Sequence, residues 1–214
     1  MRVSDVHQWA QCEQRALQAP RSEASRINVA AWVGTAAHAI LNSQPVEEPS
    51  RLAFDRITPD FRTAARQARM IAERAWHELT TQEWILVNQE RAVRSDSVEG
   101  HLDILAYHRE HGHAVIDLKT GQTASGWLQV GGYIDLLPVD ERERIRWGGI
   151  LSATRVPLVK EIPVKLELRP ATRLIIAWRD VKRRVDAILD GERATTTPGL
   201  HCGSCPLDCA VRAS

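Results

Sequence analysis

Long apolar runs, an excess of charge of one sign, internal repeats and low-complexity segments are all missing from this chain of 214 residues. No apolar run approaches the roughly 18 residues that cross a bilayer, so the sequence predicts no membrane partner. Residues 1–5 lead into a polar segment rather than a signal peptide, and we expect a cytoplasmic protein. The net charge of +1 provides no global attraction to nucleic acid, which would require a local basic patch or a metal.

The chain does contain enough apolar residues for a core, at 43% of its length. Helical spacing of these residues occurs at 29–41, 59–80, 126–137 and 170–189. Strand patterns occur at 84–87, 91–93, 100–107, 113–119, 149–153 and 158–164. This order predicts an α/β or α+β fold with a mixed central sheet. We expect residues 1–214 to form a single domain.

The most informative stretch is Asp117-Leu118-Lys119, which ends an apolar run. Side chains alternate between the faces of a β-strand, so Asp117 and Lys119 point the same way. Residues 101–119 form a predicted hairpin that turns near 109–112, which places Asp103 opposite residue 117 or within a position or two of it. Like charges that face each other across a hairpin are destabilising. The pattern therefore predicts a cation between the two carboxylates, with an ammonium group beside it.

Such a site suits phosphodiester cleavage, because a divalent cation activates water and stabilises developing negative charge. Mg²⁺ prefers oxygen ligands and takes only a few from protein. Asp103, Asp117 and the Leu118 carbonyl are the candidate ligands, and Lys119 would orient or deprotonate the attacking water. The alternative is a surface ion pair of little energetic value. The apolar run and the second acid favour the metal site.

Two predicted helices carry further polar candidates. His38 lies in a run of small residues at 34–39, which lets a helix approach a sheet closely, although a lone helical histidine is more often a core or surface residue than a ligand. Gln129 and Tyr133 are four residues apart and share a helix face. An amide and a phenol so placed can hydrogen-bond phosphates or stack on a base. By spacing alone, a half-buried tyrosine beside a surface glutamine is the simpler interpretation.

Three of the four cysteines, Cys202, Cys205 and Cys209, form a C-x2-C-x3-C pattern near the C-terminus. In a cytoplasmic chain such cysteines are more often metal ligands or free thiols than disulfides. With Cys12 as the fourth ligand, the set suits zinc or an iron–sulfur cluster. His201 in place of Cys12 would suit zinc better. Tail thiols without a metal, with Cys12 merely buried, are the remaining alternative.

The last predicted helix carries a set of basic residues, but nearby acids dilute them, so a solvated face is the usual explanation. They are Arg169, Arg173, Arg179, Lys182, Arg183 and Arg184. A contact with the DNA backbone here is the alternative. The tryptophans mostly fall on apolar stripes and are predicted to be core residues. Trp127 is the exception to test, because it precedes Gln129 on the helix that follows Lys119.

Taken together, the chain resembles the RecB-like branch of the PD-(D/E)XK nucleases over nearly its whole length. Four segments match in the family's order: residues 34–38 (GTAAH), 100–103 (GHLD), 117–121 (DLKTG), and 129–133, which fits Q-x3-Y. Cys12 with the C-terminal trio is similar to the 4Fe–4S arrangement of AddB-type and CRISPR-adaptation nucleases. The family commonly has five residues in the second cysteine gap, and this chain has three.

The resemblance implies a restriction-endonuclease-like mixed sheet flanked by helices, with residues 1–27 and 190–214 joined at the four-cysteine cluster. It implies a Mg- or Mn-dependent deoxyribonuclease that acts on single strands or strand ends. The enzyme would work alone or with protein partners in recombination, repair or CRISPR adaptation. The chain has no G-x4-G-K-[S/T] loop, so it encodes no helicase activity.

The resemblance also assigns roles to residues. The metal would be held by His38, Asp103, Asp117 and the Leu118 carbonyl, with Lys119 as the catalytic lysine and Gln129 and Tyr133 positioning DNA. Asn42 lies where the family often has an acid after the histidine. A different class of function is a non-catalytic DNA-binding scaffold held together by its metal. The intact pair of acids and the lysine disfavour that alternative.

Overall fold

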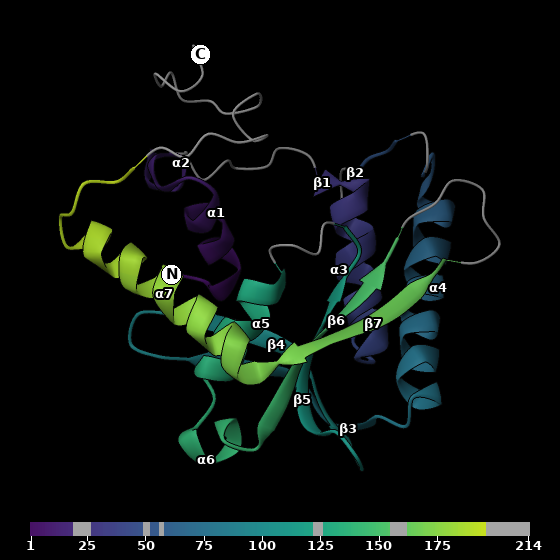
Figure 1. Ribbon diagram of the computed structural model, residues 1–214. Coiled ribbons are helices and arrows are strands. Elements are labelled where there is room, and N and C mark those ends of the chain that lie inside the picture. The colour runs from purple at the N-terminus through teal and green to yellow at the C-terminus, as the bar shows by residue number, and fades with distance from the viewer. Residues whose placement is uncertain (19–26, 49–51, 56–57, 122–125, 155–161, 196–214) are drawn as a thin grey trace.

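A five-stranded mixed sheet forms the centre of the molecule (Figure 1). The structure is a computed structural model that describes residues 1–18, 27–48, 52–55, 58–121, 126–154 and 162–195. The strands are β3 (Ile85–Arg94), β4 (Glu99–His108), β5 (Gly112–Lys119), β6 (Ile145–Ala153) and β7 (Val164–Pro170). They lie side by side in sequence order, and only the β5–β6 pair is parallel. The predicted mixed central sheet is confirmed.

Helices cover both faces of the sheet, and Figure 1 shows α3 and α4 on one side and α5 and α7 on the other. The helices are η1 (Val3–Asp5, a 3-10 turn), α1 (Val6–Gln11), α2 (Glu13–Gln18), α3 (Val29–Leu41), α4 (Phe61–Thr81), α5 (Gly126–Asp135), α6 (Val139–Arg142) and α7 (Ala171–Leu189). A short parallel pair, β1 (Ile27–Asn28) and β2 (Leu52–Ala53), flanks α3. The parallel β5–β6 pair needs a crossover, and α5 and α6 supply it.

The alternation of side chains along β5 divides the core into two layers. Ile116 and Leu118 pack with α3 and α4 in one apolar cluster, whereas Val115 packs with α5 and α7 in the other. All three side chains are fully buried. Asp117 is two residues from Val115 on the same strand, so its side chain also points toward the layer that contains α5. A strand that is covered on both faces has a nearly continuous apolar sequence, and this run is the feature that predicts a strand at residues 113–119.

Helix α5 can approach α7 closely because it carries glycines at the contact. A Cβ on Gly131 would lie 2.3 Å from the backbone oxygen of Leu174, and a Cβ on Gly132 would lie 2.8 Å from the Trp178 ring. Contacts of that length do not occur between real side chains and a backbone oxygen. These two positions therefore set how closely α5 packs against α7.

Two strand predictions were wrong in their bounds. Residues 84–87 and 91–93 belong to one strand, β3, which is interrupted by a register shift between Leu86 and Asn88 and by a left-handed φ of 48° at Glu90. In the strand predicted at 158–164, residues 162–163 are not part of a strand, β7 begins at Val164, and 158–161 lie outside the described residues. The alternate residues Lys165, Glu167 and Arg169 of β7 are exposed, as is common on an edge strand, and they mask its apolar pattern.

Smaller differences concern helix ends and one tryptophan. Helix α5 ends at Asp135 and a separate turn, α6, follows, where a single helix over 126–137 was predicted. Trp76 on α4 is 48% exposed, so the prediction that it belongs to the core was wrong. None of the helices in the described part of the chain combines the length and hydropathy of a membrane span.

Candidate active site

The two predicted acids lie where β4 and β5 stop pairing. The hairpin turns at residues 109–111, and its ladder runs from His108↔Gly112 to Ile104↔Ile116. One further step in the same register places Asp103 opposite Asp117. The Leu118 backbone N–H donates a hydrogen bond of 2.8 Å to Asp103 Oδ2, which ties the two strand ends together. The register of the last paired residues agrees with the predicted facing of the two acids.

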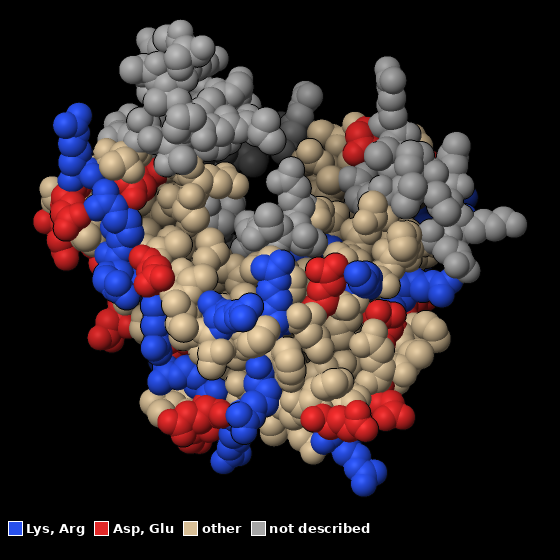
Figure 2. Space-filling model, in the orientation of Figure 1, with Lys and Arg blue, Asp and Glu red and all other residues tan. Residues whose placement is uncertain are grey.

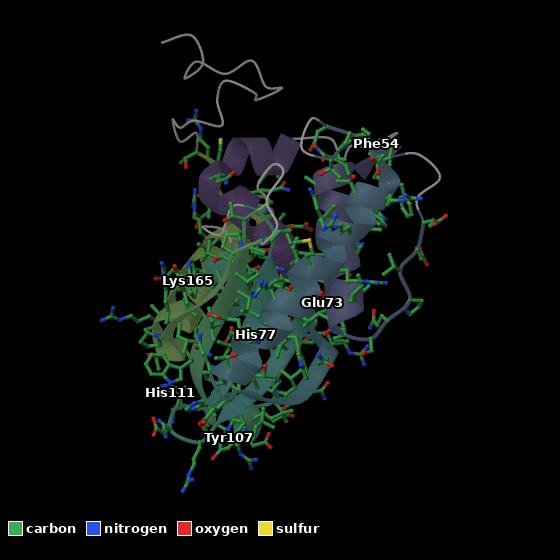
Figure 3. All side chains as sticks on the ribbon, turned by 90° about the vertical axis from the view of Figure 1, so that its right-hand side faces the viewer. Phe54, Glu73, His77, Tyr107, His111 and Lys165 are labelled. Atoms are coloured by element: carbon green, nitrogen blue, oxygen red, sulfur yellow. The ribbon has the colours of Figure 1, made fainter. Side chains whose placement is uncertain are left out.

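The site is at the end of the strands remote from the hairpin turn. Figure 3 views the molecule from the side of α4, with Tyr107 and His111 of the turn region at the lower end. The Tyr107 and His113 rings pack at a tilt with centroids 5.0 Å apart, and the ring centroids of His111 and His108 are 4.5 Å apart. These aromatic contacts close one end of the sheet and leave the opposite end for the acids.

The Asp117 carboxylate is buried, and only one of its two oxygens has a charged partner in the described part of the chain. It is 1% exposed, and its Oδ2 lies 2.8 Å from Lys119 Nζ, as the shared strand face predicts. Its Oδ1 has no hydrogen-bond partner among the described residues. Burial, and next the charge of Asp103, raise the pKa of Asp117 to about 7. An anionic oxygen held in this way is suited to a cation.

His38 reaches the acids from α3, across the sheet end from α5. Its Nδ1 lies 3.1 Å from Asp103 Oδ2, and its side chain is 24% exposed. The approach depends on Gly34, where a Cβ would lie 2.7 Å from Thr120 Oγ1. Burial alone would lower the pKa of His38, but the charge and hydrogen bond of Asp103 outweigh it and raise that pKa to about 9. The small residues before His38 therefore let α3 lie close to the end of the sheet, as the sequence predicts.

Glu90 is a site residue that the sequence analysis missed. Its carboxylate, the His38 ring and the Asp103 carboxylate each offer a ligand atom, and these atoms lie within 4.8 Å of one another. The Asn42 side-chain amide donates a hydrogen bond of 2.6 Å to Glu90 Oε1. Burial, followed by the charge of Asp103, raises the pKa of Glu90. Glu90 falls in the gap between the strands predicted at 84–87 and 91–93, so no sequence pattern marks it.

The donor set fits a divalent cation. It combines carboxylate oxygens with one imidazole, a set that matches Mn²⁺ better than Mg²⁺. Within the described residues the compact group is His38, Glu90 and Asp103, whereas Asp117 is paired with Lys119. The orphaned Oδ1 of Asp117 remains available as a further ligand atom. The role of the Leu118 carbonyl stays a prediction.

Gln129 and Tyr133 belong to the same network rather than to a separate surface. Lys119 Nζ donates a hydrogen bond of 2.7 Å to Gln129 Oε1, and Gln129 Nε2 donates to the Tyr133 hydroxyl. Tyr133 is 4% exposed, and burial raises its pKa. The simpler interpretation, a surface glutamine beside a half-buried tyrosine, was wrong. The pair orients the lysine amine from the α5 side while Asp117 orients it from the strand.

Of the predicted cluster ligands, only Cys12 falls within the described residues. It caps the C-terminus of α1 and is 6% exposed. Cys202, Cys205, Cys209 and the alternative ligand His201 lie outside the described residues. The four-cysteine cluster, and the subregion of residues 1–27 and 190–214 built on it, therefore stay predictions.

Comparison with known proteins agrees with this geometry. Residues 4–210 match the family model described as the PD-(D/E)XK nuclease superfamily. No curated protein matches the chain in sequence. A solved structure described as a "putative exonuclease" from Eubacterium rectale superposes with a TM-score of 0.62 at 14% identity, covering 98% of this chain and 88% of that one. A second structure, of a protein called SSO0001, covers 94% of this chain and 90% of that one at 12% identity, with a TM-score of only 0.34.

The likeness to the Eubacterium rectale protein shows a shared fold, since the identity is low. The family match spans almost the whole chain and includes each residue of the acid, lysine and histidine set. The chain therefore belongs to the PD-(D/E)XK nuclease superfamily.

Proposed function

We propose that this protein is a Mg- or Mn-dependent deoxyribonuclease that hydrolyses phosphodiester bonds in single strands or at strand ends. The observation that carries the proposal is the pairing of buried Asp117 with Lys119 directly opposite Asp103. Asp117 is buried with one unsatisfied oxygen, and its Lys119 partner also bonds to Gln129. Such a pair stabilises the fold no better than two apolar side chains would. Its retention at a strand end is explained by catalysis.

Residue roles follow from the geometry. His38, Glu90, Asp103 and Asp117 would hold the ion, with the Leu118 carbonyl as a further ligand. When bound, the ion supplies an activated water and neutralises charge on the phosphate. Asp117 Oδ2 and Gln129 Oε1 hold the Lys119 amine from two sides, at 2.8 and 2.7 Å. Lys119 is thereby aimed at the water and phosphate beside the carboxylates, where it can orient the water or move its proton.

The strand-end preference rests on the family resemblance and on the fold shared with the protein described as an exonuclease. On the face that Figure 2 shows, basic and acidic side chains are mixed, and α7 carries Asp180 and Asp186 among its Lys and Arg residues. A narrow contact with one strand fits that charge distribution better than a broad contact with duplex DNA. The same features fit a stand-alone enzyme or the nuclease subunit of a recombination, repair or CRISPR-adaptation complex.

We further propose a 4Fe–4S cluster held by Cys12, Cys202, Cys205 and Cys209. Support comes from Glu13, which accepts hydrogen bonds of 2.7 and 2.8 Å from the Thr195 backbone N–H and hydroxyl. Thr195 is seven residues before Cys202, so the tail starts beside Cys12. Anaerobically purified protein should be brown, with iron and sulfide in equal amounts. A colourless protein with one zinc would refute the cluster and leave the nuclease proposal standing.

The deciding experiment incubates end-labelled single- and double-stranded DNA with the protein in Mg²⁺, Mn²⁺ or chelator. We expect metal-dependent degradation of the single strand and loss of at least a hundredfold in rate for Lys119→Ala, because acid–base groups of this kind contribute about 10²–10⁴-fold. The variant should keep its melting temperature within a few degrees. Equal cleavage by wild type and Lys119→Ala would refute the assignment. Tight DNA binding without any cleavage would support the non-catalytic scaffold instead.

A further inference from the structure

The basic residues near the C-terminal helix divide into two groups once their partners are known. Four of them form ion pairs with acids. These pairs are Arg179–Asp135 at 2.7 Å, Lys182–Asp186 at 2.6 Å, Arg183–Asp180 at 3.2 Å and Arg184–Glu13 at 2.8 Å. Charges neutralised in this way attract a polyanion weakly. The solvated-face interpretation is therefore correct for these four residues.

Arg169 and Arg173 form no ion pair with any described residue, and both are exposed. Arg169 is the residue before the end of β7, and its guanidinium carbon lies 4.0 Å from the centroid of the Trp127 ring. A guanidinium stacked on an aromatic face is held in one plane, and its N–H donors point outward from the edge. Trp127 is 8% exposed, so it serves as a support for Arg169 rather than as an open stacking surface.

A cavity of about 490 Å³ lies between these two arginines and the helices. Trp127, Leu128, Leu174 and Ala177 form its apolar walls, and Arg169 and Arg173 also line it. Its volume lies within the range of about 300–1,000 Å³ that is typical of small-ligand sites. An apolar wall beside two arginines that pair with no acid in the described part of the chain matches a sugar or base carrying phosphate groups.

The cavity is next to the candidate active site along α5. Gly126 directly precedes Trp127, and a Cβ at Gly126 would lie 3.1 Å from Lys119 Cε. Across the sheet, Asp117 pairs with Ile150 and Ile150 pairs with Glu167, which lies two residues before Arg169 and on the same face of β7. A strand whose phosphate lies at Lys119 therefore needs to extend only along the start of α5 to reach Arg169.

We propose that Arg169 and Arg173 bind the backbone phosphates of a DNA single strand that leaves the catalytic centre, with one nucleotide seated in the apolar cavity between them. This inference rests on the proposed function and names how that site selects its substrate. A single strand is the occupant because an unpaired nucleotide can turn into a cavity of this size, whereas a paired base cannot. The stacked Arg169 fixes the path of the strand, and Arg173 neutralises the next phosphate.

The test measures binding of a fluorescent single-stranded oligonucleotide by anisotropy, with wild type and variants in chelator so that no cleavage occurs. Arg169→Ala and Arg173→Ala should each weaken binding about tenfold, as expected for a lost charge-assisted hydrogen bond. The slope of log affinity against log salt should fall by about one for each. Arg183→Ala, which removes an exposed but paired charge on α7, is the matched control and should change affinity less than twofold.

Arg169→Lys separates charge from geometry, because lysine keeps the charge but loses the flat edge of donors. We expect Arg169→Lys to bind with an affinity between those of wild type and Arg169→Ala. We also expect it to fold, so it serves as the test variant if Arg169→Ala is unstable. The inference is overturned if Arg169→Lys and Arg173→Ala bind like wild type, or if the Arg183→Ala control loses as much affinity. Failure of the proposed function gives a different result: wild type would show no cleavage in Mg²⁺ or Mn²⁺, while the two arginines would still control binding.

Discussion

Replacing Asp117 by asparagine should destroy activity yet stabilise the metal-free protein. The pKa of Asp117 is raised from 3.8 to about 7 by burial and by Asp103, so the folded state holds a proton that the unfolded chain releases. The stability of the folded state therefore falls as the pH rises from about 4 to about 7. Each unit of pKa shift corresponds to about 1.4 kcal/mol, so the charged form costs on the order of a few kcal/mol at pH 8. Asp117→Asn removes that cost without changing shape.

The same substitution at the facing acid should do the opposite. Burial opposes the charge of Asp103, but the His38 ring and the Leu118 N–H outweigh it and lower the pKa of Asp103. A lowered pKa means that the charged form contributes stability above about pH 4. Asp103→Asn removes this contribution, and with it the charge that keeps His38 protonated. We therefore expect Asp103→Asn to destabilise the metal-free protein at pH 8.

Urea denaturation in chelator at pH 8 and pH 5 measures both effects. The unfolding free energy of Asp117→Asn should exceed that of wild type at pH 8, and the difference should shrink at pH 5, where wild-type Asp117 is largely protonated. Both variants should fail to cleave DNA in Mn²⁺. A lower unfolding free energy for Asp117→Asn at pH 8 would refute the description of Asp117 as an uncompensated buried charge.

Three further outcomes follow from the same structure. Glu90→Gln should weaken Mn²⁺ binding at least tenfold by titration calorimetry, since it removes one charged donor of the site; unchanged affinity would exclude Glu90 as a ligand. Gly131→Ala should lower the unfolding free energy by about 1–3 kcal/mol or more, because its Cβ would meet the α7 backbone. The control Gly121→Ala has open space at its Cβ and should change the unfolding free energy by less than about 0.5 kcal/mol. The rise in melting temperature caused by Mn²⁺ should grow between pH 5.5 and 8.5, because the pKa values of Asp117 and His38 are both raised, to about 7 and about 9, and metal must displace their protons; an equal rise at every pH would contradict this.

The sequence by itself determined the features that depend on local periodicity. Alternation along residues 113–119 placed Asp117 and Lys119 on one face, and the short turn set Asp103 opposite them. Small residues before His38 indicated a helix that lies close to the sheet, as the Gly34–Thr120 contact shows. These patterns repeat every two or about 3.6 residues, so neighbouring residues carry the information.

Only the tertiary structure decided which distant groups meet. Glu90 joins the site across 48 residues through Asn42, from a strand whose bulge hides its periodicity. Gln129 reaches Lys119 because Gly126 on α5 and Gly148 on β6 let the helix lie close to the sheet. Ion pairing likewise separates the neutralised arginines from Arg169 and Arg173. Such contacts depend on the heights and angles of packed elements, which no single segment of the chain encodes.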